Sequence, residues 1–334
     1  MNLSRRAFIA AGLAGFGSMV FNVDHPLAFA QTRANASIHC LLDTTSADAE
    51  YVGIYLPTRG INYSKINQSL FSGSRLGDGL SAPASLSDDS VMTRTVIGDD
   101  TRTRLTGTNT FPYNATCYIE TTWPDGSVTK GTASFASLTM AFTAGHCVFD
   151  LDYGGFAKSI RVWPGRNGSY APCGSANVDS VYIPIEYHRA RDKKYDYAAL
   201  GFIPSNLPSA LKTHSYLGAR FYTDSNAGGQ YIRIDGYPGE REDPEFWGSM
   251  GYIDSDPDNY YHRWRYSIDT TGGMSGTPLA TLAGAEEPNR IVGVHVAGTN
   301  NPSTSPYNYG IKMDRRMIRF ATSFRVHGED WGNV

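Results

Sequence analysis

The sequence has little charge and no surplus of basic residues. Only 18% of its 334 residues are Asp, Glu, Lys or Arg, and 29 basic against 32 acidic side chains leave a formal net charge of −3. Proteins that bind nucleic acid through its phosphates need a surplus of Lys and Arg. We therefore do not expect nucleic acid to be a partner.

Long apolar runs are missing beyond the N-terminus. The run from Ala7 to Phe21 is shorter than the ~20 residues of a membrane-spanning helix, so we expect no stable membrane anchor. It follows Arg5-Arg6 and precedes small residues suited to a signal peptidase, so residues 1–30 are predicted to be a signal peptide cleaved near Ala30. The paired arginines resemble a twin-arginine signal, with an ordinary Sec signal as the alternative. We expect a secreted protein, extracellular or periplasmic.

Cysteine is scarce. The four cysteines are Cys40, Cys117, Cys147 and Cys173, and no two of them have the close spacing of zinc ligands. Acidic runs such as Asp254 to Asp258 are explained as well by solvated loops as by calcium. We therefore expect no metal site and no cofactor.

What the chain has in abundance is turn residues between short β-prone runs. Residues 31–94 are rich in Ser, Asp, Gly and Ala, and we interpret them as a propeptide or an N-terminal extension that stays attached. From residue 95 to 334 the pattern predicts an all-β sandwich or barrel, with one helix over Asp314–Phe324. The predicted strands lie within Cys117–Glu120, Leu138–Phe142, Ile160–Trp163, Val181–Ile183, Tyr197–Phe202, Tyr231–Ile234, Tyr261–Ile268 and Ile291–Val296.

Three short segments indicate chemistry. Thr143-Ala144-Gly145-His146-Cys147, an aspartate in Tyr195-Asp196-Tyr197, and Ser275 in Gly272-Gly273-Met274-Ser275-Gly276 follow in the order His, Asp, Ser. A serine hydroxyl becomes a useful nucleophile when an imidazole takes its proton and a carboxylate orients that imidazole. Asp150 and Asp192 are competitors for the carboxylate, but only Asp196 leads directly into an apolar strand. The segments predict a serine peptidase.

Together these motifs resemble the trypsin/chymotrypsin superfamily, and finer features resemble its bacterial glutamyl endopeptidase branch. The segments that carry the second resemblance are Val96-Ile97-Gly98-Asp99-Asp100, Val162 to Gly168, Ile234 to Gly239, and Ile291 to His295. The resemblance implies two packed antiparallel six-stranded β-barrels with a C-terminal helix. It also implies a serine endopeptidase that acts on proteins or peptides, and we expect a monomer.

The resemblance assigns roles to individual residues. His146 is the general base, Asp196 orients it, Ser275 is the nucleophile, and the backbone N–H groups of Gly273 and Ser275 form the oxyanion hole. Met274 stands where the family often has Asn, and we expect its side chain at the rim of the substrate site.

Specificity depends on the P1 pocket, which binds the side chain before the cleaved bond. Thr270 and His295 occupy the positions that bind a substrate carboxylate in glutamyl endopeptidases, and Gly293 is expected to leave room for that pocket. The resemblance further implies that cleavage near Arg94-Thr95-Val96 frees an N-terminal amine, which acts as a cation near the P1 pocket. The alternative is a preference for Arg or Lys at P1. Asp269 supports it, because trypsin-like enzymes place the carboxylate that binds Arg or Lys six residues before the nucleophile.

The resemblance also implies a disulfide at Cys147. We favour Cys147–Cys173, with Cys117–Cys147 as the alternative. Two other classes of function remain open. One is a secreted β-barrel binding protein without activity. The other is an esterase, although the Gly-x-Ser-x-Gly motif is not matched.

Overall fold

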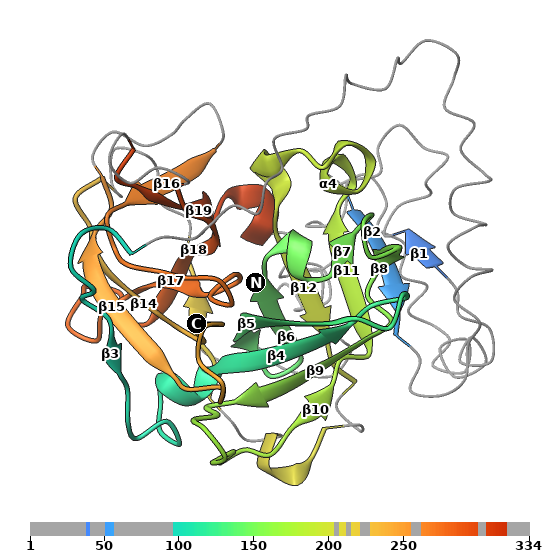
Figure 1. Ribbon diagram of the computed structural model, residues 1–334, viewed down its shortest axis with the longest axis horizontal. Coiled ribbons are helices and arrows are strands. Elements are labelled where there is room, and N and C mark those ends of the chain that lie inside the picture. Colours follow the sequence, from blue (N-terminus) through green and yellow to red (C-terminus); the bar gives the residue numbers. More distant parts are fainter. Residues whose placement is uncertain are drawn as a thin grey trace, which may run out of the picture.

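Two antiparallel β-sheets, each curled into a barrel, make up most of the computed structural model (Figure 1). The structure describes residues 38–40, 51–56, 96–203, 207–211, 215–220, 228–254, 262–299 and 305–318. The predicted signal peptide and most of the predicted propeptide therefore lie outside the described residues.

The N-terminal barrel has the strand order β1-β2-β11-β12-β6-β5-β4-β9-β10. The barrel closes because β10 pairs with β9 at one edge of the sheet, and the chain then continues into β11, which pairs with β12. Between β10 and β11, Val178 N–H donates to Ile160 O of β9 (2.9 Å). Its strands are β1 (Ile38–Cys40), β2 (Tyr51–Tyr55), β4 (Thr116–Thr122), β5 (Val128–Ser137), β6 (Met140–Thr143), β9 (Ser159–Pro164), β10 (Ala176–Asn177), β11 (Ser180–Pro184) and β12 (Ala198–Gly201).

The C-terminal barrel has the order β16-β19-β18-β17-β14-β15-β3, with β13 pairing β18. A bridge between Ile253 and Tyr266 joins the end of β15 to β16 and closes it. Its strands are β3 (Thr103–Arg104), β13 (Gly218–Ala219), β14 (Tyr231–Gly236), β15 (Trp247–Tyr252), β16 (Arg263–Tyr266), β17 (Pro278–Thr281), β18 (Arg290–Ala297) and β19 (Asn308–Lys312). The expected pair of antiparallel β-barrels is confirmed, but the two sheets of the described chain have nine and eight strands where six each were expected.

Short elements complete the described chain. They are the hairpin β7 (Phe149–Asp150) and β8 (Gly155–Phe156), the helix α4 (Ile185–Ala190), and the 3-10 turns η2 (Tyr113–Ala115), η3 (Gly145–Cys147), η4 (Lys193–Tyr195) and η6 (Ser209–Leu211). Of the helix expected over Asp314–Phe324, the structure shows residues 315–318, and the remainder lies outside the described residues. Asp314 Oδ1 caps its start by accepting the Met317 N–H (2.6 Å).

Two main apolar clusters form the core of the described chain. The C-terminal core includes Trp264, Leu279 and Val292. The larger N-terminal core fills the other barrel and also includes residues of β17, β18 and β19 such as Ala280, Ile291 and Ile311. A Cβ on Gly293 would lie 2.6 Å from Ile311 O and 3.0 Å from the Trp264 ring. The glycine is therefore required for close packing of β18 on its neighbours, and the expectation that it leaves room for a pocket is wrong.

Neither predicted disulfide is present. Cys117, Cys147 and Cys173, the cysteines whose side chains the structure describes, are buried and form no disulfide with one another. The Cys147 Sγ lies 3.9 Å from Ser275 O and faces Gly131, where a Cβ would lie 3.2 Å from it. Burial raises the pKa of Cys117 and the nearby Cys173 raises it further, so Cys173 lies close to Cys117.

Thr132 of β5 joins the two barrels. Its N–H donates to Ser275 O (2.8 Å), and its Oγ1 donates to Gly273 O (3.1 Å) while accepting the Tyr237 N–H (3.1 Å). Strand β5 of the N-terminal barrel thus holds the Gly273–Ser275 turn of the C-terminal barrel.

Replacing Thr132 by Val should therefore disturb the contact between the barrels. The two side chains have similar shape, but the hydroxyl is lost and two buried backbone groups lose a partner, which costs about 1–3 kcal/mol. We expect the free energy of unfolding in urea to fall by that amount. Thr122→Val is the matched control, because the half-buried Thr122 hydroxyl has no hydrogen bond among the described residues. Equal effects of the two substitutions would contradict this role of Thr132.

Candidate active site

His146 lies in η3, directly after β6. Its loop approaches the chain around Asp196 closely: a Cβ on Gly145 would lie 2.9 Å from the Tyr187 ring and 3.0 Å from Asp196 Oδ1. Glycine at position 145 therefore allows the histidine to reach the aspartate.

Asp196 ends η4 and precedes β12. Its Oδ1 accepts the His146 backbone N–H (2.9 Å), and its Oδ2 lies 2.8 Å from His146 Nδ1. The two competing aspartates have other partners, since Asp150 pairs with Arg191 (3.3 Å) and Asp192 accepts the Lys194 N–H (3.0 Å). The structure brings Asp196 to the histidine, as the sequence predicts.

Ser275 completes the group from the other barrel. Its Oγ lies 2.6 Å from His146 Nε2, and the residue is 2% exposed. Tight turns hold it, with Met274 N–H donating to Thr271 O and Thr277 N–H to Met274 O, both at 3.1 Å. A proton on Ser275 Oγ can thus pass to Nε2 while Nδ1 remains bonded to the carboxylate.

The electrostatics of the pair favour the charged forms of both groups. Burial lowers the pKa of His146, but the charge and hydrogen bond of the Asp196 carboxylate, together with the neighbouring Cys147, outweigh burial, so the pKa lies above its usual value. Burial raises the pKa of Asp196, and the opposing effect of His146 leaves it below the usual value. An imidazolium formed when Ser275 gives up its proton is therefore stabilised where it forms.

The turn before Ser275 exposes backbone donors. Gly273 has φ of +87°, and a Cβ there would lie 2.6 Å from Gly239 N, so glycine is required. Gly239 N–H bonds to Gly272 O, and because C=O and N–H point oppositely in a trans peptide, the Gly273 N–H points away from Gly239. Neither Gly273 N–H nor Ser275 N–H has a backbone acceptor among the described residues, as an oxyanion hole requires.

Met274 does not line the substrate site. Its side chain is fully buried in the C-terminal core with Ile232, Ile268 and Leu279. The expectation of a rim position is wrong because the turn that presents Ser275 points the preceding side chain into the barrel.

The two predicted pocket residues are both fully buried. His295 belongs to β18, and its backbone bonds with Gly276 and Thr277 (2.8 Å each) place it beside the turn that carries Ser275. Its Nδ1 lies 2.7 Å from Tyr266 Oη, while Thr270 Oγ1 has no hydrogen bond among the described residues. Sequence reasoning missed Tyr266, because a tyrosine in an apolar strand resembles any other core residue.

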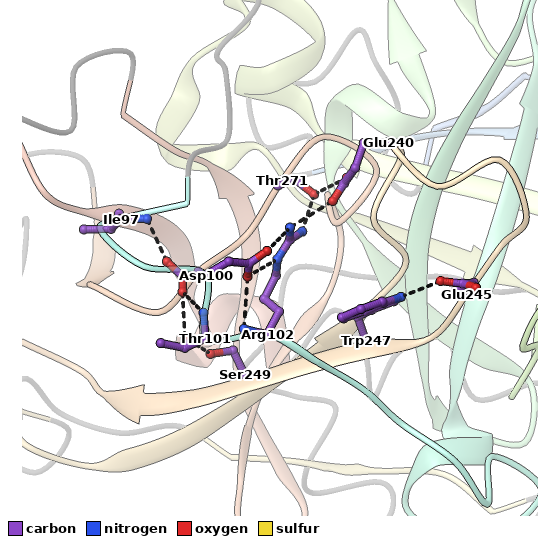
Figure 2. A network of polar contacts seen from close by, with 10 residues as sticks. Ile97, Asp100, Thr101, Arg102, Glu240, Glu245, Trp247, Ser249 and Thr271 are labelled. Atoms are coloured by element: carbon purple, nitrogen blue, oxygen red, sulfur yellow. Dashed lines mark hydrogen bonds and ion pairs between the residues drawn. The ribbon is translucent and has the colours of Figure 1, made fainter.

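The Asp269 carboxylate binds the chain just after Val96, and its partners Ile97 and Thr101 are labelled in Figure 2. Its Oδ1 accepts the Ile97 N–H (2.7 Å), and its Oδ2 accepts the Thr101 N–H (2.8 Å) and the Thr101 hydroxyl (2.6 Å). The carboxylate is 1% exposed and thus anchors residues 97–101.

Arg102, which sequence reasoning also missed, links the segment after Val96 to Thr271 and Glu240 (Figure 2). It makes a two-pronged contact with Asp100 (2.9 Å each), pairs with Glu240 (2.9 Å) and donates to the Thr271 hydroxyl (2.7 Å). Its side chain is 4% exposed, and Arg102 lowers the pKa of Asp100. Nothing in the sequence distinguishes this arginine, since its partners other than Asp100 are distant in the chain.

Comparison with known proteins identifies the family. No protein-family model matches the sequence. The chain is 31% identical over 237 residues to a glutamyl endopeptidase of Bacillus licheniformis, covering 70% of this chain and 69% of that protein. The chain belongs to the glutamyl endopeptidase branch of the chymotrypsin-like serine peptidases. It is a serine endopeptidase.

Other similar proteins agree on the fold. A Bacillus subtilis protein named extracellular metalloprotease is 31% identical over 221 residues, covering 65% of this chain and 66% of that protein. The solved structure of a Glu endopeptidase matches with a TM-score of 0.58 and 29% identity, covering 69% of this chain and 98% of that one. The protease Anisep from Arthrobacter nicotinovorans matches at 0.53 and 20% identity, covering 63% of this chain and 95% of that one.

Within the part of this peptidase that the structure describes, no three His, Cys, Asp or Glu side chains form a group that could hold a metal ion. None of the helices in that part is long and apolar enough to cross a membrane.

Arg102 and its partners Asp100, Glu240 and Thr271 should influence catalysis although they touch no reacting atom. We expect Arg102→Met to lower kcat/KM by about ten- to a hundredfold, because small misplacement of the loop Thr270–Gly273 is enough for such a loss. Peptide hydrolysis measures it. Arg104→Met is the matched control, since Arg104 is 48% exposed and its ion pair with Glu245 is worth little. Rescue by Arg102→Lys would show that charge alone suffices and would contradict positioning by the guanidinium fork.

Proposed function

We propose that this peptidase is secreted and hydrolyses peptide bonds after Glu, or Asp, through a triad of His146, Asp196 and Ser275. The observation that carries the proposal is the unbroken chain of contacts from Ser275 Oγ to His146 Nε2 (2.6 Å) and from Nδ1 to Asp196 (2.8 Å). His146 takes the proton of Ser275 as Oγ attacks the scissile carbonyl, and later returns it to the leaving amine. The acyl-enzyme is then hydrolysed by water.

The preference for an acidic side chain is supported by what surrounds the pocket residues. An unpaired carboxylate is costly to bury, so its pocket must offer donors. Thr270 has an unused buried hydroxyl. Burial raises the pKa of Tyr266, so its hydroxyl keeps a proton to donate to His295 Nδ1, which places the proton of a neutral His295 on Nε2 as a donor for the substrate.

The basic alternative loses support at Asp269. A carboxylate that recognises Arg or Lys must face the substrate, whereas both Asp269 oxygens accept hydrogen bonds from residues 97–101. The same contacts are consistent with maturation near Arg94-Thr95-Val96, because they hold the new N-terminal segment beside Thr270. Cleavage near Ala30, and then a second cleavage near Thr95, complete the proposal.

The decisive experiment is the P1 preference. The processed protein is incubated with a peptide library, and the cut sites are sequenced, with Ser275→Ala as the inactive control. We expect cuts after Glu, and we expect Asp269→Asn to lower the overall rate without altering the preference. Cuts after Arg or Lys that disappear in Asp269→Asn would move specificity to Asp269. No cleavage at all would favour a binding protein without activity.

The triad also predicts a pH effect with a definite sign. Asp196 raises the pKa of His146, so Asp196→Asn should lower that pKa and shift the acid limb of the kcat/KM profile to lower pH. The rate itself should fall by about 10,000-fold, because the amide favours the wrong tautomer. The profile is measured on a P1-Glu substrate above about pH 5.5, where its carboxylate is ionised.

Asp192→Asn serves as the control for this pH experiment. Asp192 lies four residues away and caps η4 through Lys194 N–H. An acid limb that moves equally in both variants, or upward in Asp196→Asn, would contradict the assigned role of Asp196.

A further inference from the structure

The N-terminal barrel carries an additional strand from a segment that the sequence predicts to be removed. Strand β2 pairs antiparallel with β11 over five positions, from Tyr51 opposite Pro184 to Tyr55 opposite Ser180. One residue later, Leu56 N–H donates to Asp179 O (2.9 Å). Figure 1 shows β2 along the outer side of β11, at the far end of the barrel from the C-terminal barrel.

We propose that residues 51–56 remain bound to the peptidase after cleavage near Thr95, as a noncovalently held strand of its N-terminal barrel. The inference rests on the maturation in the proposed function. Residues 57–95 separate Leu56 from Val96, so a cut near Thr95 leaves β2 connected to the enzyme only through its contacts.

The described side chains of β2 and that of the next residue, Leu56, are buried like those of a core strand. Tyr51, Ile54 and Leu56 are 1%, 5% and 4% exposed, and all three belong to the N-terminal core. Release would expose these side chains together with the edge of β11. An unpaired edge strand of this length is a site of aggregation, which binding of β2 prevents.

Gly53 provides the closest fit between the two strands. A Cβ at this position would lie 2.1 Å from the Tyr182 ring of β11, and Tyr182 itself is 6% exposed. The ring therefore lies directly against the backbone of β2. Such complementarity requires glycine and would have no purpose in a linker that only leads to a cleavage site.

Tyr51 connects the strand to the chain that carries Asp196. Its hydroxyl donates to Arg316 O (3.2 Å) and lies 3.1 Å from the Tyr197 hydroxyl, which can donate to it. The Arg316 guanidinium lies over the rings of Tyr51 (5.2 Å) and Tyr195 (5.0 Å). Tyr195 and Tyr197 flank Asp196, so the bound strand supports the backbone on both sides of the triad carboxylate.

The test uses the chain from residue 31 onward with Ser275→Ala, so that no step depends on its own activity. A recognition sequence for an added, specific protease is inserted between Arg94 and Thr95. After cutting, size-exclusion chromatography with mass analysis should show the fragment 31–94 eluting with the peptidase in a one-to-one complex, also after dilution. A fragment that separates under native conditions, whether the remainder is monomeric or pairs with a second copy through β11, would overturn the proposal.

Matched glycine variants locate the attachment. Gly53→Ala should weaken retention of the fragment, with Kd rising about tenfold or more because the added methyl overfills the contact with Tyr182. Gly284→Ala should leave Kd unchanged, since a Cβ there meets nothing within 4 Å. Tyr51→Phe is the second variant, and it should speed release while keeping the ring. Equal retention in all variants would show that other residues hold the fragment and would contradict the role of β2.

These results are separate from those on specificity. Retention of the fragment in the Ser275→Ala protein does not depend on the P1 preference or on the natural processing protease. If the peptide library shows no cleavage after Glu, the specificity proposal fails while the bound strand can still be measured.

Discussion

The catalytic geometry depends on the contact between β5 and the turn that carries Ser275. His146 and Ser275 lie on different barrels. The 2.6 Å distance between His146 Nε2 and Ser275 Oγ therefore persists only if the two barrels keep their positions relative to each other. Thr132 does this with three hydrogen bonds to the turn and to Tyr237. Gly276 packs so closely there that a Cβ would lie 2.1 Å from Thr132 O and 3.0 Å from Ala144 N. The nucleophile turn thus lies directly against the chain that leads to His146.

A second constraint acts on the opposite side of the same turn. Asp269 and Arg102 are charged and almost fully buried, which is costly unless each charge has partners. Asp269 obtains three donors from residues 97–101, and Arg102 obtains Asp100, Glu240 and Thr271. Each group is satisfied only when the segment after Val96 lies against the loop Asp269–Gly273. The loop Asp269–Gly273 is therefore coupled to the placement of this segment by the cost of leaving a buried charge unpaired.

The sequence predicted what is encoded locally. The motifs around His146, Asp196 and Ser275 identified three residues that the structure brings together, and the β-prone runs coincide with strands of both barrels. Strands such as β17 and β19 were missed because they are short and contain residues typical of turns, Pro278 in β17 and Asn308 and Gly310 in β19. Strand β2 was missed because its partner β11 lies 125 residues further along the chain. Met274 and Gly293 were misjudged for one reason: whether a side chain faces substrate or core is decided by the turn and by neighbouring strands.

The absence of the expected disulfide raises the question of what holds the histidine loop. The Thr121 hydroxyl donates to Cys147 O (2.9 Å), and the His146 N–H donates to Asp196 (2.9 Å). Each such bond contributes about 1 kcal/mol, more where the acceptor is charged. Gly145 packs closely against both neighbours, since a Cβ there would lie 2.9 Å from the Tyr187 ring and 3.0 Å from Asp196 Oδ1. Because Gly131 leaves space for the Cys147 thiol without offering it a second sulfur, the loop is held by packing and hydrogen bonds that form only when the barrel has folded.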